Sequence, residues 1–100
     1  MQPQQRSRVY VIGVNSHALV AFEAISRREA NELCKEHWFR EELLSLHSDN
    51  LPIWNGKEPL MVRAAEPAEI QEYQKAQAGA DHKEADGILL AYLIPLDGAV

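Results

Sequence analysis

Three segments of this chain are almost continuously hydrophobic, namely residues 9–14, 18–24 and 88–94. A sheet with one solvated face shows alternating apolar and polar residues along each strand. These segments barely alternate, so they predict strands that are dry on both faces. The predicted helices can cover one face of such a sheet, and we expect a second copy of the chain to cover the other.

The first two segments predict an antiparallel hairpin with strands at residues 8–14 and 18–24, joined by a turn at Asn15-Ser16-His17. Gly13 lies inside the first strand, where a glycine indicates a bulge or a close approach of backbone. A third strand is predicted at residues 59–65. It is shorter and more polar than the last strand, so we expect it at an edge of the sheet.

The first helix is predicted to begin at Ser26, because Glu29 follows three residues later and completes a capping box. The helix extends to about Leu46 and carries apolar residues on two opposite sides. Such a helix either packs on both sides or is interrupted, and the change of side falls near Trp38-Phe39.

A second helix is predicted to open at Pro67, which suits the first helical position. The order ββαβαβ predicts the α+β class, as a two-layer sandwich with a four-stranded mixed sheet and two helices mainly on one face. The second helix is expected to link the last two strands as a parallel crossover. One domain is expected at residues 8–97, with a disordered tail at residues 1–7 and a short tail at residues 98–100.

The net charge of the chain argues against some classes of function. The chain of 100 residues has a net charge of −5, which argues against general binding to nucleic acid or to an anionic membrane. Residues 41–86 hold ten Asp/Glu and four Lys/Arg. This acidic stretch is either an ordinary solvated surface or a patch that meets a basic partner.

Cysteine content and hydropathy bear on the compartment. Cys34 is the single cysteine, so the chain is not a secreted module held by internal disulfides. Residues 1–7 lack the apolar core of a signal peptide, and the longest apolar run is too short to span a bilayer. The sequence therefore predicts a cytoplasmic protein.

Cys34 and His37 are the most chemically suggestive pair, because a Cys-x-x-His spacing can supply half of a zinc site. The other half is missing at any expected spacing, and a thiolate nucleophile prefers a helix start to a mid-helix position. We therefore predict a structural cysteine, no metal, no cofactor and no catalytic residue.

The leading hypothesis is a small, non-enzymatic protein-binding protein that acts as a homodimer with a protein partner. The candidate interface residues are apolar side chains of the second helix stripe, of the loop that follows it and of the last strand. They are Phe39, Leu43, Leu46, Trp54, Leu90 and Leu93.

Two other hypotheses remain open. The first is a small dimeric α+β enzyme or small-molecule binder with a pocket between sheet and helices. Its candidate lining residues are Tyr10, Phe22, His37, Trp38 and Tyr92. The second is an acidic inhibitor or nucleic-acid mimic that uses the carboxylates of residues 66–86.

Overall fold

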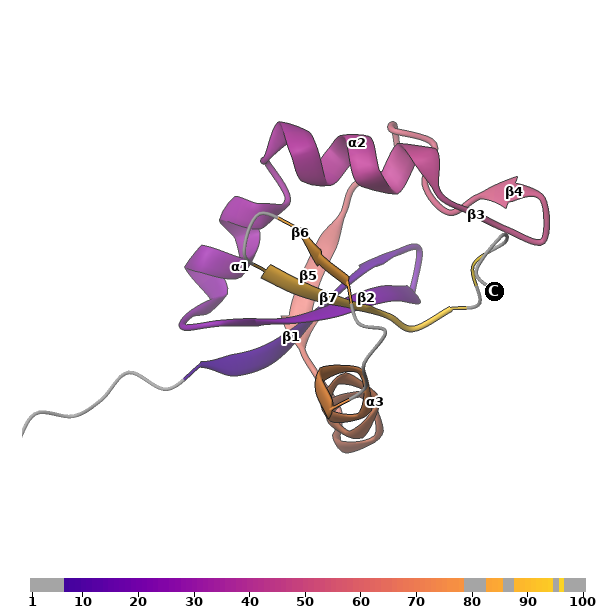
Figure 1. The fold of residues 1–100 in the computed structure, drawn as a ribbon. Helices are drawn as coiled ribbons and strands as arrows, with labels where there is room; N and C mark the ends of the chain where they lie inside the picture. The colour runs from indigo at the N-terminus through magenta and orange to yellow at the C-terminus, as the bar shows by residue number, and fades with distance from the viewer. Residues whose placement is uncertain (1–6, 79–82, 86–87, 95, 97–100) are drawn as a thin grey trace, which may run out of the picture.

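The sheet is built on a hairpin of two long strands, β1 (Arg8–Val14) and β2 (His17–Ala24). The computed structural model, shown in Figure 1, describes residues 7–78, 83–85, 88–94 and 96. It has an α+β fold with four main antiparallel strands and three helices.

The turn of this hairpin has the geometry that a right-handed twist demands. Asn15 and Ser16 both adopt positive φ angles, of 50° and 68°. Positive φ angles at both turn residues are typical of the type I′ turns that two-residue hairpin loops favour. The register shifts between Ile12 and Gly13. A Cβ on Gly13 would lie 2.5 Å from the backbone oxygen of His17, so the predicted bulge and close backbone approach are confirmed.

Two further strands flank the hairpin. β5 (Met61–Ala64) pairs with β1 and is an edge strand, as predicted, while β7 (Ile88–Tyr92) pairs with β2. The short β6 (Lys83–Ala85) extends the sheet beyond β7 to the order β5-β1-β2-β7-β6.

Every strand pairing in the described sheet is antiparallel, so the predicted mixed sheet with a parallel crossover is wrong. β5 and β7 lie on opposite sides of a hairpin whose own strands run in opposite directions. They therefore run antiparallel to each other, and the segment between them crosses both central strands.

The first helical region consists of two helices, α1 (Arg27–Leu33) and α2 (His37–Ser45). The predicted start is confirmed, because the Ser26 hydroxyl oxygen accepts a hydrogen bond of 3.1 Å from the Glu29 N–H. The interruption lies at residues 34–36, earlier than expected. Three backbone hydrogen bonds between residues three apart tighten the chain there and end α1.

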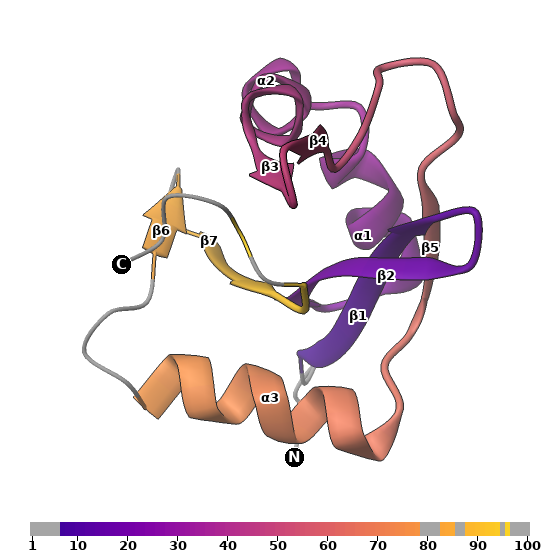
Figure 2. The same ribbon diagram turned by 90° about the vertical axis from the view of Figure 1, so that its right-hand side faces the viewer.

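Figures 1 and 2 show the three helices on both faces of the sheet, with α1 and α2 above it and α3 (Pro67–Ala78) beneath it. The predicted arrangement of two helices mainly on one face is therefore wrong. The core on the α1 and α2 side contains thirteen buried residues: Tyr10, Ile12, Val14, Leu19, Val20, Phe22, Ala24, Ala30, Leu33, Phe39, Leu43, Trp54 and Leu90.

The face expected to bind a second copy of the chain is covered by α3. Tyr73 of this helix is 3% exposed and packs in one cluster with Val11, Ala21 and Ala91. Its hydroxyl donates a 3.0 Å hydrogen bond to the Glu23 carboxylate, which fastens the helix to β2. This face is therefore covered within one chain and does not require a second copy to remove it from water.

The role of α3 as a cover can be tested at Tyr73. Tyr73→Phe removes only the hydrogen bond and should lower the free energy of unfolding by about 1 kcal/mol. Tyr73→Ala also removes the buried ring and should cost about 3 kcal/mol. Urea denaturation of the three proteins measures both values. Equal stabilities for the two variants would contradict the burial of the ring beneath the sheet.

Candidate functional site

Four of the six candidate interface residues lie in the interior of the domain. Phe39 and Leu43 are fully buried, Trp54 is 3% exposed and Leu90 is 4% exposed, whereas Leu46 and Leu93 are half-buried. The interruption between α1 and α2 reorients the second apolar stripe toward the sheet. Phe39, Leu43, Trp54 and Leu90 therefore form core contacts and are not part of an exposed surface.

The candidate pocket residues also belong to the core, with one exception. Tyr10 and Phe22 are buried, and Trp38 and Tyr92 pack against the same cluster. The side chain of His37 is 90% exposed and lies 3.9 Å from Glu41. The aromatic rings thus fill the space between sheet and helices, and the imidazole points to solvent instead of into that space.

Burial and a nearby carboxylate change the electrostatics of the Tyr92 hydroxyl. Its hydroxyl is buried and makes no hydrogen bond of ordinary geometry within the described part of the chain. Burial raises the pKa of Tyr92, and the negative charge of the nearby Glu42 raises it further. The group therefore stays protonated at physiological pH and forms part of the core.

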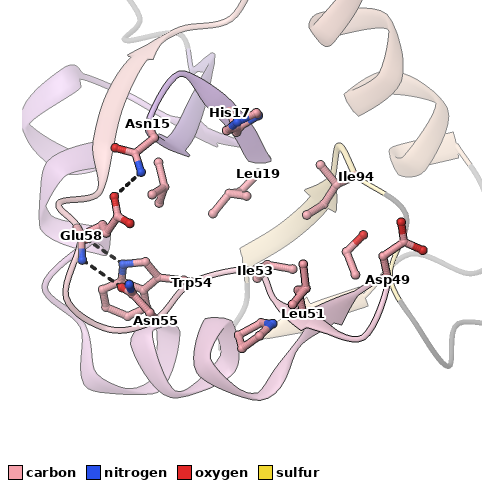
Figure 3. Close-up of a pocket in the computed structure, with 13 residues that line it drawn as sticks. Asn15, His17, Leu19, Asp49, Leu51, Ile53, Trp54, Asn55, Glu58 and Ile94 are labelled. Atoms are coloured by element: carbon pink, nitrogen blue, oxygen red, sulfur yellow. Dashed lines mark hydrogen bonds between the residues drawn. The ribbon is translucent and has the colours of Figure 1, made fainter.

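The structure instead brings together a groove of about 530 Å³ between two hairpin turns (Figure 3). One turn joins β1 to β2. The other joins β3 (His47–Ser48) to β4 (Leu51–Pro52), and its residues Asp49 and Asn50 again have positive φ angles. Besides these turns, the loop that follows β4 and the segment after β7 contribute to the lining. The residues that line the groove are Val14, Asn15, His17, Leu19, Ser48, Asp49, Leu51, Pro52, Ile53, Trp54, Asn55, Glu58 and Ile94.

The floor of the groove is apolar. Val14 and Leu19 reach it from the central hairpin, and both are buried. Ile53 and Ile94 are half-buried and contribute the remaining aliphatic surface. Leu51 lies at the rim and is 67% exposed, the largest exposed fraction among the large hydrophobic residues of the described chain. The groove therefore offers apolar surface that the folded chain does not cover.

Hydrogen bonds hold the wall formed by residues 54–58 in place (Figure 3). The Asn55 side-chain oxygen accepts hydrogen bonds from the backbone N–H groups of Lys57 and Glu58, at 2.8 and 3.0 Å. The Trp54 indole N–H donates to the Glu58 carbonyl oxygen at 2.7 Å. The Asn15 side-chain amide donates to the Glu58 carboxylate and so ties this wall to the opposite hairpin turn.

Sequence reasoning located parts of this groove without assembling them. The sequence predicts Trp54 as a candidate interface residue of a loop, and it predicts the turn at residues 15–17. Trp54 proves to be a buried support for the groove wall. No pattern in the sequence indicates that Asn15 and Glu58 meet, because 43 residues separate them.

Within residues 7–78, 83–85, 88–94 and 96, no three His, Cys, Asp or Glu side chains are grouped as metal ligands would be. His17 and Glu58 come from different segments, and the Glu58 carboxylate is already bound by an amide. The arrangement can hold an apolar group, whereas its polar atoms mostly support the fold.

No family model matches this chain, and comparison with curated proteins and with solved structures finds no significant similarity. Among the helices that the structure describes, none has the length and hydrophobicity needed to cross a membrane.

Cys34 lies away from the groove lining and is partly buried. Burial raises the pKa of the Cys34 thiol to about 11, against a smaller lowering effect of the Arg40 charge. His37 begins the next helix and is exposed, so the two residues do not share one continuous helix face as their spacing suggested.

The thiol should therefore react slowly with a disulfide reagent such as DTNB. At about pH 8 roughly one thiol in a thousand is ionised, and the rate should rise about tenfold for each pH unit up to about pH 10. The reference is the urea-unfolded chain, in which the reaction should be much faster at about pH 8. Equal rates in the folded and unfolded chains at that pH would contradict the raised pKa.

Proposed function

We propose that this chain is a non-enzymatic protein-binding protein and that the groove between the two hairpin turns holds a segment of its partner. The observation that carries this proposal is the apolar, open groove with Leu51 exposed at its rim. Its volume falls in the range of roughly 300–1,000 Å³ that is typical of ligand sites. One or two large apolar side chains of a partner fit a space of this size.

The polar groups of the groove favour a partner side chain over a polar metabolite. A small polar substrate needs several free, convergent hydrogen-bonding groups to orient it. The Asn55 oxygen and the Trp54 N–H are engaged in bonds within the chain. An apolar anchor needs no such groups, because its binding comes from the removal of its surface from water.

A small-molecule binder is the second candidate, now at this groove instead of the filled space between sheet and helices. The volume of the groove is the observation in its favour. The acidic-mimic hypothesis has less support, because basic residues interrupt the acidic surface. Glu69 pairs with Arg63 and Glu72 pairs with Lys75.

The groove can be tested with peptides selected from a random library on the immobilised protein. The selected peptides should share an apolar residue and shift the NMR signals of the Trp54 indole and of residues 51–58. Leu51→Gln should weaken their binding about fivefold, because part of a leucine side chain is lost from the contact. Met61→Gln is the matched control.

Met61 is 62% exposed, close to the 67% of Leu51, and lies outside the groove lining. Its replacement should leave the affinity unchanged. Equal losses in the two variants, or signal shifts confined to other parts of the chain, would overturn the proposal. Shifts caused by apolar small molecules but by no peptide would favour the second candidate.

We also propose that the expected homodimer forms through the edge of β5. The Ala65 N–H donates to the Val9 carbonyl oxygen, so alternation along the strand turns the backbone groups of Val62 and Ala64 outward. An outward row of this kind can pair with the same strand of a second copy. One Arg63 nitrogen donates to the Ala64 carbonyl oxygen at 3.2 Å, and this bond competes with such pairing.

Arg63→Ala should therefore strengthen self-association, since it frees the Ala64 carbonyl oxygen. Sedimentation velocity of both proteins, up to about 200 µM, should show a monomer–dimer equilibrium that shifts toward dimer in the variant. The mass of a single chain for both proteins over the whole range would contradict dimerisation at this edge.

A further inference from the structure

We infer that the groove selects partner segments in which a Lys or Arg lies beside the apolar anchor, an inference that rests on the proposed function. Among the described lining residues, Glu58 supplies a carboxylate at the rim, and none is a Lys or Arg. The rim therefore carries negative charge around an apolar floor. A basic residue next to the anchor complements that charge, whereas an acidic one is repelled.

The charge of Glu58 is held in position without being neutralised. Its carboxylate accepts a hydrogen bond from the Asn15 amide, which is a neutral donor. Its backbone N–H is fixed by Asn55 and its carbonyl oxygen by Trp54. A partner cation therefore meets a carboxylate that is already oriented at the groove, which lowers the ordering cost of the contact.

Nearby cations of the chain leave this charge uncompensated within the groove. Lys57 precedes Glu58 in the sequence, and Arg40 lies 5.3 Å from the centre of the Trp54 ring, but neither side chain lines the groove. Elsewhere the acidic residues Glu32, Glu69 and Glu72 have basic partners. The groove thus combines apolar surface with the negative charge of Glu58, which no Lys or Arg among the described lining residues offsets.

Three capped peptides with one apolar anchor test this selectivity. They are acetyl-Ser-Lys-Leu-Lys-Ser-amide, its counterpart with Gln in place of Lys, and its counterpart with Glu. Each is titrated into the isotope-labelled protein while NMR follows the Trp54 indole and residues 51–58. The Lys peptide should bind about tenfold more tightly than the Gln peptide in about 20 mM salt. The Glu peptide should bind more weakly than both.

Glu58→Gln supplies the decisive variant, because its side-chain oxygen can still accept the hydrogen bond from Asn15. It should reduce the advantage of the Lys peptide over the Gln peptide about threefold, because the charge is lost while the amide keeps the shape of the side chain. Glu72→Gln changes the net charge equally on α3, beneath the sheet and outside the groove lining. This control should preserve the advantage. A salt concentration of about 300 mM should reduce the advantage of the Lys peptide in the unsubstituted protein and in both variants.

The outcomes separate the two proposals. If none of the peptides perturbs residues 51–58, the groove does not bind partner segments of this kind and both proposals fail. If all three bind there with equal affinity, the proposed function stands and the charge selectivity is overturned. An equal loss in Glu58→Gln and Glu72→Gln would attribute the preference to net charge and also overturn the selectivity.

Discussion

Both faces of the β1–β2 hairpin are buried from solvent, and the rest of this structure depends on that constraint. Val11 and Ala21 point to one face and Ile12 and Val20 to the other, and all four are buried. Apolar surface of this extent has to be removed from water. The chain does so by placing α1 and α2 on one face and sending α3 across to the other (Figure 2). The long connections around the hairpin follow from this requirement.

The local sequence predicts the parts of the fold whose causes are local. Ser26 and Glu29 mark the start of α1, and Gly13 marks the bulge. The interruption after α1 lies at residues 34–36, whereas the sequence predicts it near Trp38-Phe39. Residues 34–36 include neither glycine nor proline, so no local signal marks the end of the helix. Burial of Phe39 and Leu43 against the sheet decides where the helix ends, and such tertiary packing routinely overrides propensity.

The position of α3 and the groove have causes that lie far apart in the sequence. The apolar face of α3 is thin, with Ile70, Tyr73 and Ala76, so it does not reveal which side of the sheet it covers. The groove requires four segments to meet, among them the turns at residues 15–16 and 49–50. The sequence can indicate that such residues lie in turns. It cannot indicate that the two turns face each other across a groove, because that depends on the assembled fold.

The remaining question is why the groove stays open instead of collapsing onto its own apolar floor. Both turns that border it have positive φ angles at two residues, which fixes the direction of each hairpin. The bonds from Asn55 and Trp54 brace the wall formed by residues 54–58, and the bond from Asn15 to Glu58 links this wall to the β1–β2 turn. These turn angles and hydrogen bonds hold the segments on either side of the groove in their positions. Leu51 thus remains exposed at the rim, above an apolar floor that the folded chain leaves open.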